Sequence, residues 1–312
     1  ITGPNADRLS VLNGGWTITW QGNREELYPS DKKTIKAAVM DKLGRESVLY
    51  EPAVSYDTEL NINNAVALAA QSDVILACLG EEPYCETPGN IDDLTLPDAQ
   101  LHLVESLAKT GKPVVLVLSE GRPRIVNRIV NQCQAIIMVY LPGMEGGTVL
   151  ADILFGDVNP SGKLSFTYPR FVNNFTLYDH VYSEQASYNP QWPFGYGLSY
   201  TTFAYTDLKV GQTNVRAGEP VQVQVTVTNT GKRAGAEVVQ LYVSDLVASA
   251  LPAVKRLKGF TKIYLQPGES RQVRFTLSSA DLSFINERGK PVLEPGEFKV
   301  TIEKLSELFR LI

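Results

Sequence analysis

The chain of 312 residues is 44% hydrophobic and 20% charged, a composition typical of a globular protein, and its length indicates about two domains. The formal net charge is −5 and no long run of lysine or arginine occurs, which argues against nucleic acid and anionic membranes as partners. No apolar stretch approaches the ~18 residues that predict a membrane span.

The cysteines and histidines are too few and too scattered to predict a metal site. The three cysteines, Cys78, Cys85 and Cys133, show no C-x-x-C spacing, and the only histidines are His102 and His180. We therefore expect no metal, no cofactor and at least one unpaired thiol. A chain of this size needs no disulfides for secretion, so the cysteines leave the cellular compartment open.

The first residues, "ITGPNAD", are typical of a strand that ends at Thr2 and runs into a turn. Neither an initiator methionine nor a signal peptide precedes them. We therefore expect the chain to be part of a longer protein, with any targeting sequence upstream of Ile1.

Residues 1–167 alternate between strand and helix patterns. The expected strands are continuous aliphatic runs at 47–52, 74–80, 113–121 and 135–143. The expected helices, with the usual proline and glycine punctuation, lie at 62–73, 97–111, 122–133 and 145–156. Strands that are apolar at every position are buried on both faces, so we predict a doubly wound α/β sandwich with a mainly parallel sheet over residues 1–168. In such sheets, ligands bind at the carboxyl ends of the strands.

The pattern changes after a connection, residues 169–202, that is irregular and rich in aromatic residues. From about residue 203, apolar and polar residues alternate with the period of two that indicates strands with one buried face. The alternating segments are 221–231, 236–245, 271–279 and 297–305. We predict a small immunoglobulin-like or fibronectin-like β-sandwich over residues 203–312. It carries no cysteine pair, which excludes a true antibody-type domain.

Two common enzyme classes built on α/β folds lack their motifs here. The first strand–helix turn reads "GPNAD" and not G-x-G-x-x-G, and there is no P-loop. "GMEGG" at 143–147 is interpreted as a tight turn, although a nucleotide-binding protein with phosphate at these glycines stays an alternative. The G-x-S-x-G elbow of a serine hydrolase is also absent from the sequence. His102 is expected to be structural within a helix, and His180 has no assignable partner.

Three carboxylates crowd the loop that follows the expected strand 74–80. "GEEPYCETPGN" contains Glu81, Glu82 and Glu86, broken by Pro83 and Pro88. A loop glutamate is usually only solvated, but a loop at the carboxyl end of a parallel strand is where functional groups are found. The loop is therefore the candidate for acid–base chemistry.

The same loop resembles a known family. "GEEPYCETPGNIDDLTLP" is similar to the acid/base loop of glycoside hydrolase family 3, the β-glucosidases and glucan exohydrolases. "NGGWTITWQG" resembles the family's entry into its second domain, and "YLPGMEGGTVLADILFGDVNPSGKLSFTYP" resembles its sheet-terminal signature. "FGYGLSYTTFAYTDL" resembles the passage into its fibronectin type III-like domain. These matches run from residue 3 to about 300 in the family's order.

The resemblance implies a retaining β-glycosidase of the β-glucosidase type that hydrolyses terminal β-D-glucosyl residues. Two carboxyl groups about 5–5.5 Å apart do this chemistry, one as nucleophile and one as acid/base. Family members supply the nucleophilic aspartate from an N-terminal (β/α)8 barrel that is absent here. We therefore expect the chain alone to be inactive, and the whole protein to be periplasmic or extracellular.

The resemblance also implies which residues act. The family's acid/base glutamate precedes a Gly–Asp or Gly–x–Asp pair, and Glu86 stands in that place before Gly89 and Asp92, with looser spacing. Glu81 is the runner-up, and Glu82 is expected to be solvated.

The tryptophan of "NGGWT", Trp16, would stack on a glucosyl unit, as its counterpart does in the family. Trp20 is expected to serve packing. The main rival is a non-catalytic carbohydrate-binding or interaction module, which would bind sugar without Glu86. The sequence leaves glucose and xylose open as the glycone.

Overall fold

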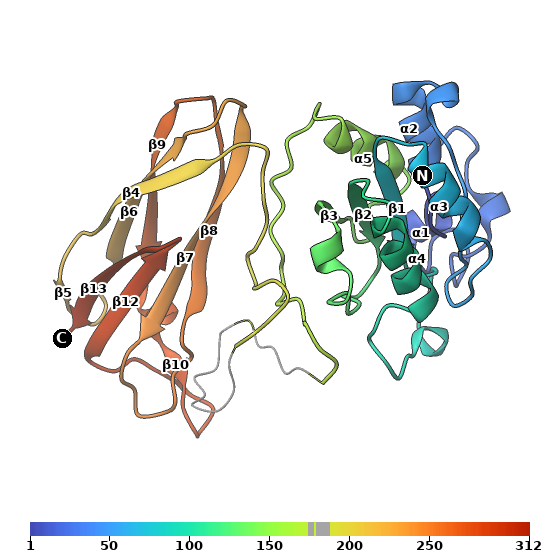
Figure 1. Ribbon diagram of the computed structural model, residues 1–312. Helices are drawn as coiled ribbons and strands as arrows, with labels where there is room; N and C mark the ends of the chain where they lie inside the picture. The colour runs from blue at the N-terminus through green and yellow to red at the C-terminus, as the bar shows by residue number, and fades with distance from the viewer. Residues whose placement is uncertain (174–177, 179–187) are drawn as a thin grey trace. The chain divides into compact units, whose positions relative to one another are not determined.

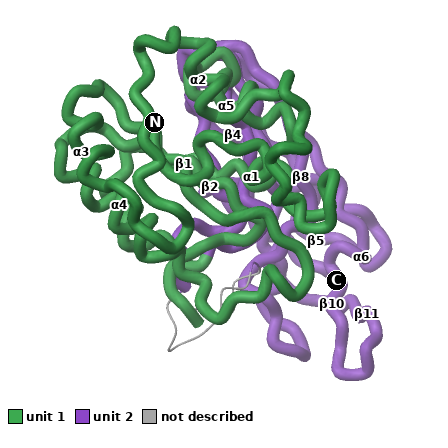
Figure 2. Tube along the Cα trace, turned by 90° about the vertical axis from the view of Figure 1, so that its right-hand side faces the viewer, with its two compact units in different colours: residues 1–158, 169–174 green, residues 159–168, 175–312 purple. Residues whose placement is uncertain are grey.

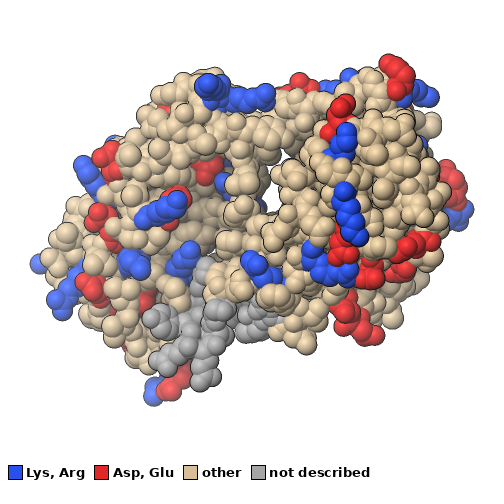
Figure 3. All heavy atoms as spheres, viewed as in Figure 1, with Lys and Arg blue, Asp and Glu red and all other residues tan. Residues whose placement is uncertain are grey.

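The computed structural model describes residues 1–173, 178 and 188–312 (Figure 1). Contacts divide the described part of the chain into two compact units (Figure 2). The first unit comprises Ile1–Val158 and Pro169–Asn174, and the second Asn159–Tyr168 and Phe175–Ile312. None of the helices in the described residues is long and apolar enough to cross a membrane. On the face seen in Figure 3, basic and acidic side chains are interspersed over the surface.

The described residues of the first unit form a three-stranded parallel sheet in the order β1-β2-β3. Its strands are β1 (Ile75–Gly80), β2 (Val114–Ser119) and β3 (Ala135–Met138). Every residue of β1 is buried and β2 is nearly so, as predicted from their continuous apolar runs. The β3 residues are more exposed than those of β1 and β2 in the described chain.

Helices cover both faces of this sheet (Figure 1). The α-helices are α1 (Ser10–Asn13), α2 (Ile35–Leu43), α3 (Ile62–Ala70), α4 (Asp98–Ala108) and α5 (Gly146–Leu154), and the 3-10 turns are η1 (Glu25–Leu27), η2 (Arg45–Ser47), η3 (Thr87–Gly89) and η4 (Val130–Gln132). Helices α2 and α5 pack together over Leu76, Cys78 and Val117, whereas α4 contacts β1 and β2 and packs against α3. The predicted doubly wound α/β architecture is confirmed.

Two predicted elements are wrong. Residues 47–52 do not form a strand, because Pro52 has no N–H to donate and Ala53 turns the chain away with φ 63; only Glu51 bridges to Thr2. Residues 122–133 do not form a helix beyond η4, because Ile125 is drawn into backbone hydrogen bonds with residues 94–96. Tertiary pairing here overrides the helical pattern.

The described residues of the second unit form a β-sandwich, as predicted. A five-stranded sheet has the order β5-β13-β12-β7-β8, a three-stranded sheet the order β4-β6-β9, and β10 pairs with β11. The strands are β4 (Phe203–Val210), β5 (Asn214–Val215), β6 (Val221–Asn229), β7 (Gly235–Asp245), β8 (Arg256–Leu265), β9 (Ser270–Leu277), β10 (Phe284–Ile285), β11 (Pro291–Val292), β12 (Gly296–Ile302) and β13 (Leu305–Leu311), with one short helix, α6 (Ser279–Leu282).

The alternation of apolar and polar residues along its strands gives the second unit its hydrophobic core. Inward residues of β6, such as Val223 and Val225, meet inward residues of β7 and β12, such as Leu241 and Val300. All four are at most 1% exposed. One buried face per strand is what a period of two predicts.

Candidate functional site

Four loops of the first unit meet at the carboxyl edge of its sheet: those after β1, β2 and β3, and the loop after α1. The contacts of three glycines demonstrate this. A Cβ on Gly15 would lie 2.5 Å from the Tyr84 carbonyl oxygen, and one on Gly121 would lie 2.9 Å from Tyr84 Oη. A Cβ on Gly14 would lie 2.6 Å from Leu141 Cδ1. The strand-end loops singled out from the sequence therefore come together.

Glu86 is presented outward from the loop after β1. Its side chain is exposed, and no described residue forms an ion pair or hydrogen bond with its carboxylate. Its backbone has φ 53 and ψ −145, a conformation that costs a residue other than glycine about 1–3 kcal/mol. The Glu86 carbonyl accepts a hydrogen bond from Gly89 N–H at 2.9 Å, which closes the η3 turn. The surrounding loops hold the residue in this shape and leave its carboxylate available to a ligand.

Glu81 is buried and already engaged. Its side chain is 6% exposed, and its Oε1 accepts hydrogen bonds from Arg122 Nε and Arg124 Nη1, each at 2.8 Å. Arg124 also donates to the carbonyl oxygens of Leu94 and Thr95. Through Arg124 the carboxylate therefore ties the end of β1 to the segments that follow β2 and precede α4. Its other oxygen, Oε2, is buried as well and is not open to solvent.

Tyr84 fills the space between these groups. The Arg122 guanidinium lies over its ring, 4.1 Å from the ring centre. Burial raises the pKa of Tyr84 to about 12, and the negative charge of Glu81 adds to the shift. The phenol is therefore neutral at physiological pH, and the residue packs closely against Gly15, Gly89 and Gly121 of the surrounding loops.

Trp16 stands on an exposed apolar surface. Its side chain is 68% exposed, and its neighbours Ile18 and Trp20 are also more than half exposed. The expectation that Trp20 is a packing residue is thus wrong for its side chain. Trp16 has φ 57, and its backbone N–H donates to the Trp20 carbonyl at 2.7 Å. This hydrogen bond fixes the turn that carries the indole. An exposed ring of this kind suits the flat C–H face of a sugar.

The remaining residues singled out from the sequence have structural roles or lie elsewhere. Glu82 is exposed and lies 3.4 Å from Arg8 Nη1. His102 Nδ1 lies 2.6 Å from Glu59 Oε1 on the surface of α4, and His180 lies outside the described residues. The glycines at 143–147 serve close packing, since a Cβ on Gly147 would strike the backbone at the start of α2. This supports the structural interpretation of that turn.

Sequence reasoning missed the residues that brace the loop: Gln21, Tyr84, Arg122 and Arg124. One signal for the two arginines was visible in the sequence. "GRPR" places them directly after the strand expected at 113–121, and the neighbouring strand, expected at 74–80, is followed directly by Glu81 and Glu82. Strand-end loops of adjacent parallel strands lie together, so an ion pair between them was predictable.

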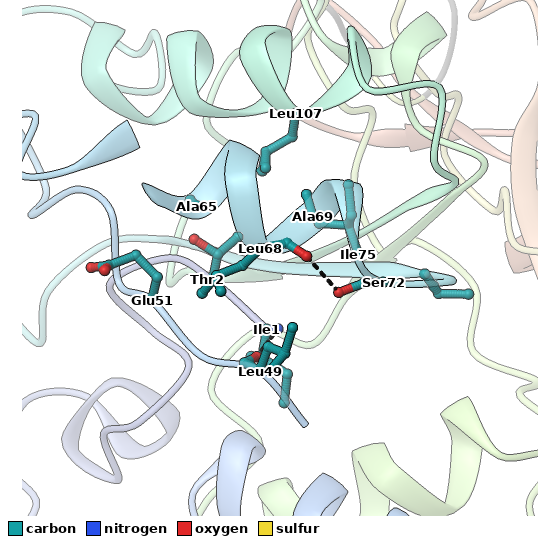
Figure 4. Close-up of a pocket in the computed structure, with 11 residues that line it drawn as sticks. Ile1, Thr2, Leu49, Glu51, Ala65, Leu68, Ala69, Ser72, Ile75 and Leu107 are labelled. Atoms are coloured by element: carbon teal, nitrogen blue, oxygen red, sulfur yellow. Dashed lines mark hydrogen bonds between the residues drawn. The ribbon is translucent and has the colours of Figure 1, made fainter. Parts of the chain in front are cut away.

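A small hollow lies apart from these loops, between α3, α4 and the start of the chain (Figure 4). Its lining includes Ile1, Leu49, Ala65 and Leu107, and its volume is about 20 Å³. That is enough for a water molecule and far too small for a sugar residue.

Two family descriptions match the chain. Residues 1–200 match the glycosyl hydrolase family 3 C-terminal domain, and residues 237–306 match the fibronectin type III-like domain.

Individual relatives agree with these matches. The chain is 41% identical to a lysosomal beta glucosidase of Dictyostelium discoideum, over 97% of this chain and 39% of that protein. It is 40% identical to a periplasmic beta-glucosidase of Salmonella typhimurium, over 97% of this chain and 44% of that protein. A beta-xylosidase of Formosa agariphila is 41% identical over 76% of this chain and 34% of that protein. The chain thus spans less than half the length of these relatives.

Solved structures give the same picture. The beta-glucosidase of Listeria innocua in complex with isofagomine superimposes with a TM-score of 0.87 at 30% identity. The superposition covers 99% of this chain and 45% of that one.

Proposed function

Because the chain belongs to glycoside hydrolase family 3, we propose that it is the C-terminal part of a retaining β-glycosidase in which Glu86 is the general acid/base. The observation that carries this proposal is the contrast between the two candidate glutamates. The Glu81 carboxylate is buried against two arginines, whereas Glu86 is exposed in a braced loop. Trp16 offers an exposed ring from the adjoining loop as a sugar platform.

In this proposal the reaction has two steps. A carboxylate outside this chain, from a barrel that precedes it, attacks the anomeric carbon while Glu86 donates its proton to the departing glycosidic oxygen. Glu86, now ionised, takes a proton from water, and that water attacks the anomeric carbon and releases the sugar with its configuration retained. Residues 1–312 alone are therefore expected to be inactive.

The proposed substrate is a β-linked glucoside or oligosaccharide with a terminal glucosyl residue. The two relatives that match 97% of this chain are named beta-glucosidases. The beta-xylosidase relative makes a β-xyloside the second candidate. The periplasmic relative supports a location outside the cytoplasm, periplasmic or extracellular. A non-catalytic sugar-binding module is the rival function, because an exposed Trp16 needs no acid to bind a sugar.

The test compares Glu86→Gln with Glu81→Gln in the full-length protein. The Glu86 change removes the transferable proton, so hydrolysis of cellobiose should fall about 10²–10⁴-fold. Formation of the glycosyl-enzyme from a dinitrophenyl glucoside, whose leaving group needs no proton, should be nearly unaffected. Glu81→Gln should lower both reactions by a similar factor. Leaving-group dependence in Glu81→Gln and not in Glu86→Gln would reverse the assignment, and its absence from both would leave the binding module as the better account.

A further inference from the structure

The side chain of Gln21 joins the loop of Trp16 to the loop of Glu86. Its Oε1 accepts a hydrogen bond from Cys85 N–H at 3.1 Å, and its Nε2 donates to the Cys85 carbonyl at 3.2 Å. Both backbone groups of the residue before Glu86 are therefore held by one carboxamide, 64 positions away in the sequence. Glutamine provides a donor and an acceptor in one plane, which no apolar or charged side chain of similar length does.

This link bears directly on Glu86. The backbone of Glu86, with φ 53 and ψ −145, lies in a region that residues with a Cβ rarely adopt, so it persists only where its surroundings enforce it. On one side the Gly89 N–H holds the Glu86 carbonyl. On the other side Gln21 fixes the Cys85 peptide groups.

The same link reaches Trp16. The Trp20 carbonyl, next to Gln21, accepts hydrogen bonds from Trp16 N–H at 2.7 Å and from Cys85 Sγ at 3.0 Å. Gly15 lies so close to Tyr84 and Cys85 that any side chain there would strike them. The two loops are therefore joined by several hydrogen bonds and close contacts, and the Gln21 side chain makes two of these hydrogen bonds.

We propose that Gln21 is a positioning residue that sets the acid/base carboxylate of Glu86 in register with a sugar stacked on Trp16. The inference rests on the proposed function of Glu86 and Trp16, and it assigns to Gln21 no contact with the substrate. Loss of the link would leave the loop free to shift, and a misplacement of about 1 Å can lower a rate on the order of 10²-fold. Proton transfer is sensitive to such displacements, whereas departure of an activated leaving group is not.

The experiment uses the full-length protein with Gln21→Leu, which keeps the approximate shape and removes both hydrogen bonds. Gln71→Leu is the matched control, since Gln71 is exposed at the end of α3 and its side chain donates to the Ala67 carbonyl of the same helix. The rate constants compared are kcat/KM for cellobiose and for a dinitrophenyl glucoside. In Gln21→Leu the cellobiose value should fall about 10²-fold, and the dinitrophenyl value should stay near that of the unchanged protein. Gln71→Leu should leave both unchanged.

Gln21→Glu provides a second measurement if Gln21→Leu does not fold. It keeps the acceptor for Cys85 N–H and loses the donor to the Cys85 carbonyl, so the same selective loss is expected. The role of Gln21 would be overturned if kcat/KM fell equally on both substrates or did not fall at all. This holds provided that Glu86→Gln lowers kcat/KM mainly for cellobiose, the substrate with the poor leaving group. If Glu86→Gln is itself unselective, the proposed function fails first and the inference fails with it.

Discussion

The Glu81 carboxylate lies 2.8 Å from the Arg124 guanidinium, and this buried ion pair joins the end of β1 to the segment after β2. Arg124→Leu would leave Glu81 with Arg122 as its remaining ion-pair partner and release the carbonyls of Leu94 and Thr95. Because Glu81 keeps one cation, we expect the free energy of unfolding to fall by about 1.5–3 kcal/mol, as for the loss of a hydrogen bond to a charged group, measured by urea denaturation.

The control for this change is Arg128→Leu. Arg128 pairs with Asp98 and Glu105 on the surface, so its loss should cost about 0–1 kcal/mol. Similar losses in the two variants would mean that the Glu81 ion pair does not brace the loop.

Lys163 anchors the segment 159–168 to the β-sandwich of the second unit. Its Nζ lies 3.3 Å from Glu237 Oε2 and donates to the Gly197 carbonyl at 2.7 Å, and both charged side chains are largely buried. Lys163→Met should destabilise this unit by about 3 kcal/mol, because Glu237 would lose its cation. The exposed Lys304, 3.7 Å from Glu303, is the control, and Lys304→Met should cost less than about 1 kcal/mol in the same thermal or urea melt.

This contact also bears on the domain boundaries. The sequence predicts domains at 1–168 and 203–312 joined by 169–202. By its contacts, the segment 159–168 belongs to the second compact unit. A fragment that begins at residue 203 should therefore be less stable than one that begins at residue 159. Equal stability of the two fragments would remove the segment from the second folding unit.

Alkaline pH should weaken the first unit through Cys78. Burial raises the pKa of this thiol from 9.0 to about 12, so the folded state favours the neutral form. The contribution of the buried neutral thiol to the free energy of unfolding is fully present below pH 9. It is lost between pH 9 and pH 12, at about 1.4 kcal/mol per pH unit. Burial also raises the pKa of Cys133, to about 11, so it adds to the slope.

The measurement is urea denaturation at pH 7 and pH 10 for the unchanged chain and for Cys78→Ala. The variant is expected to be less stable at pH 7 but to lose about 1.4 kcal/mol less between the two pH values. Parallel pH profiles would contradict the burial of Cys78 as a neutral thiol.

Trp16→Ala in the full-length protein should weaken substrate binding without unfolding the chain. The indole is 68% exposed here, so its covering by a sugar accounts for about 1.5–3 kcal/mol, equivalent to a rise in KM of about 10–100-fold. Trp20→Ala, at a comparably exposed position, is the control and should raise KM less. Equal effects of the two changes would leave Trp16 with no special role in binding.

Much of the fold was predictable because burial leaves a periodic pattern. The continuous apolar run of β1 and the alternation of β6 each report how many faces of a strand are covered. The helix expected at 122–133 does not form, because the backbone of Ile125 hydrogen-bonds with residues 94–96. No local sequence pattern encodes this pairing.

The sequence predicted which loop carries the candidate site, but not how the side chains of that loop are arranged in space. Strand-end position singled out the glutamates, but their difference in burial depends on where Arg122 and Arg124 lie in space. The Gln21–Cys85 link spans 64 positions, and nothing near Gln21 in the sequence indicates it.

The measurement that tests the central claim most directly is azide rescue of Glu86→Gly in the full-length protein, with a dinitrophenyl glucoside as substrate. Without the general base, the glycosyl-enzyme should accumulate after a burst of dinitrophenol. Azide needs no base and fits the space that the side chain leaves, so it should restore turnover and give a glucosyl azide of β configuration. No rescue, or an azide of α configuration, would contradict the role of Glu86 as the acid/base of a retaining glycosidase.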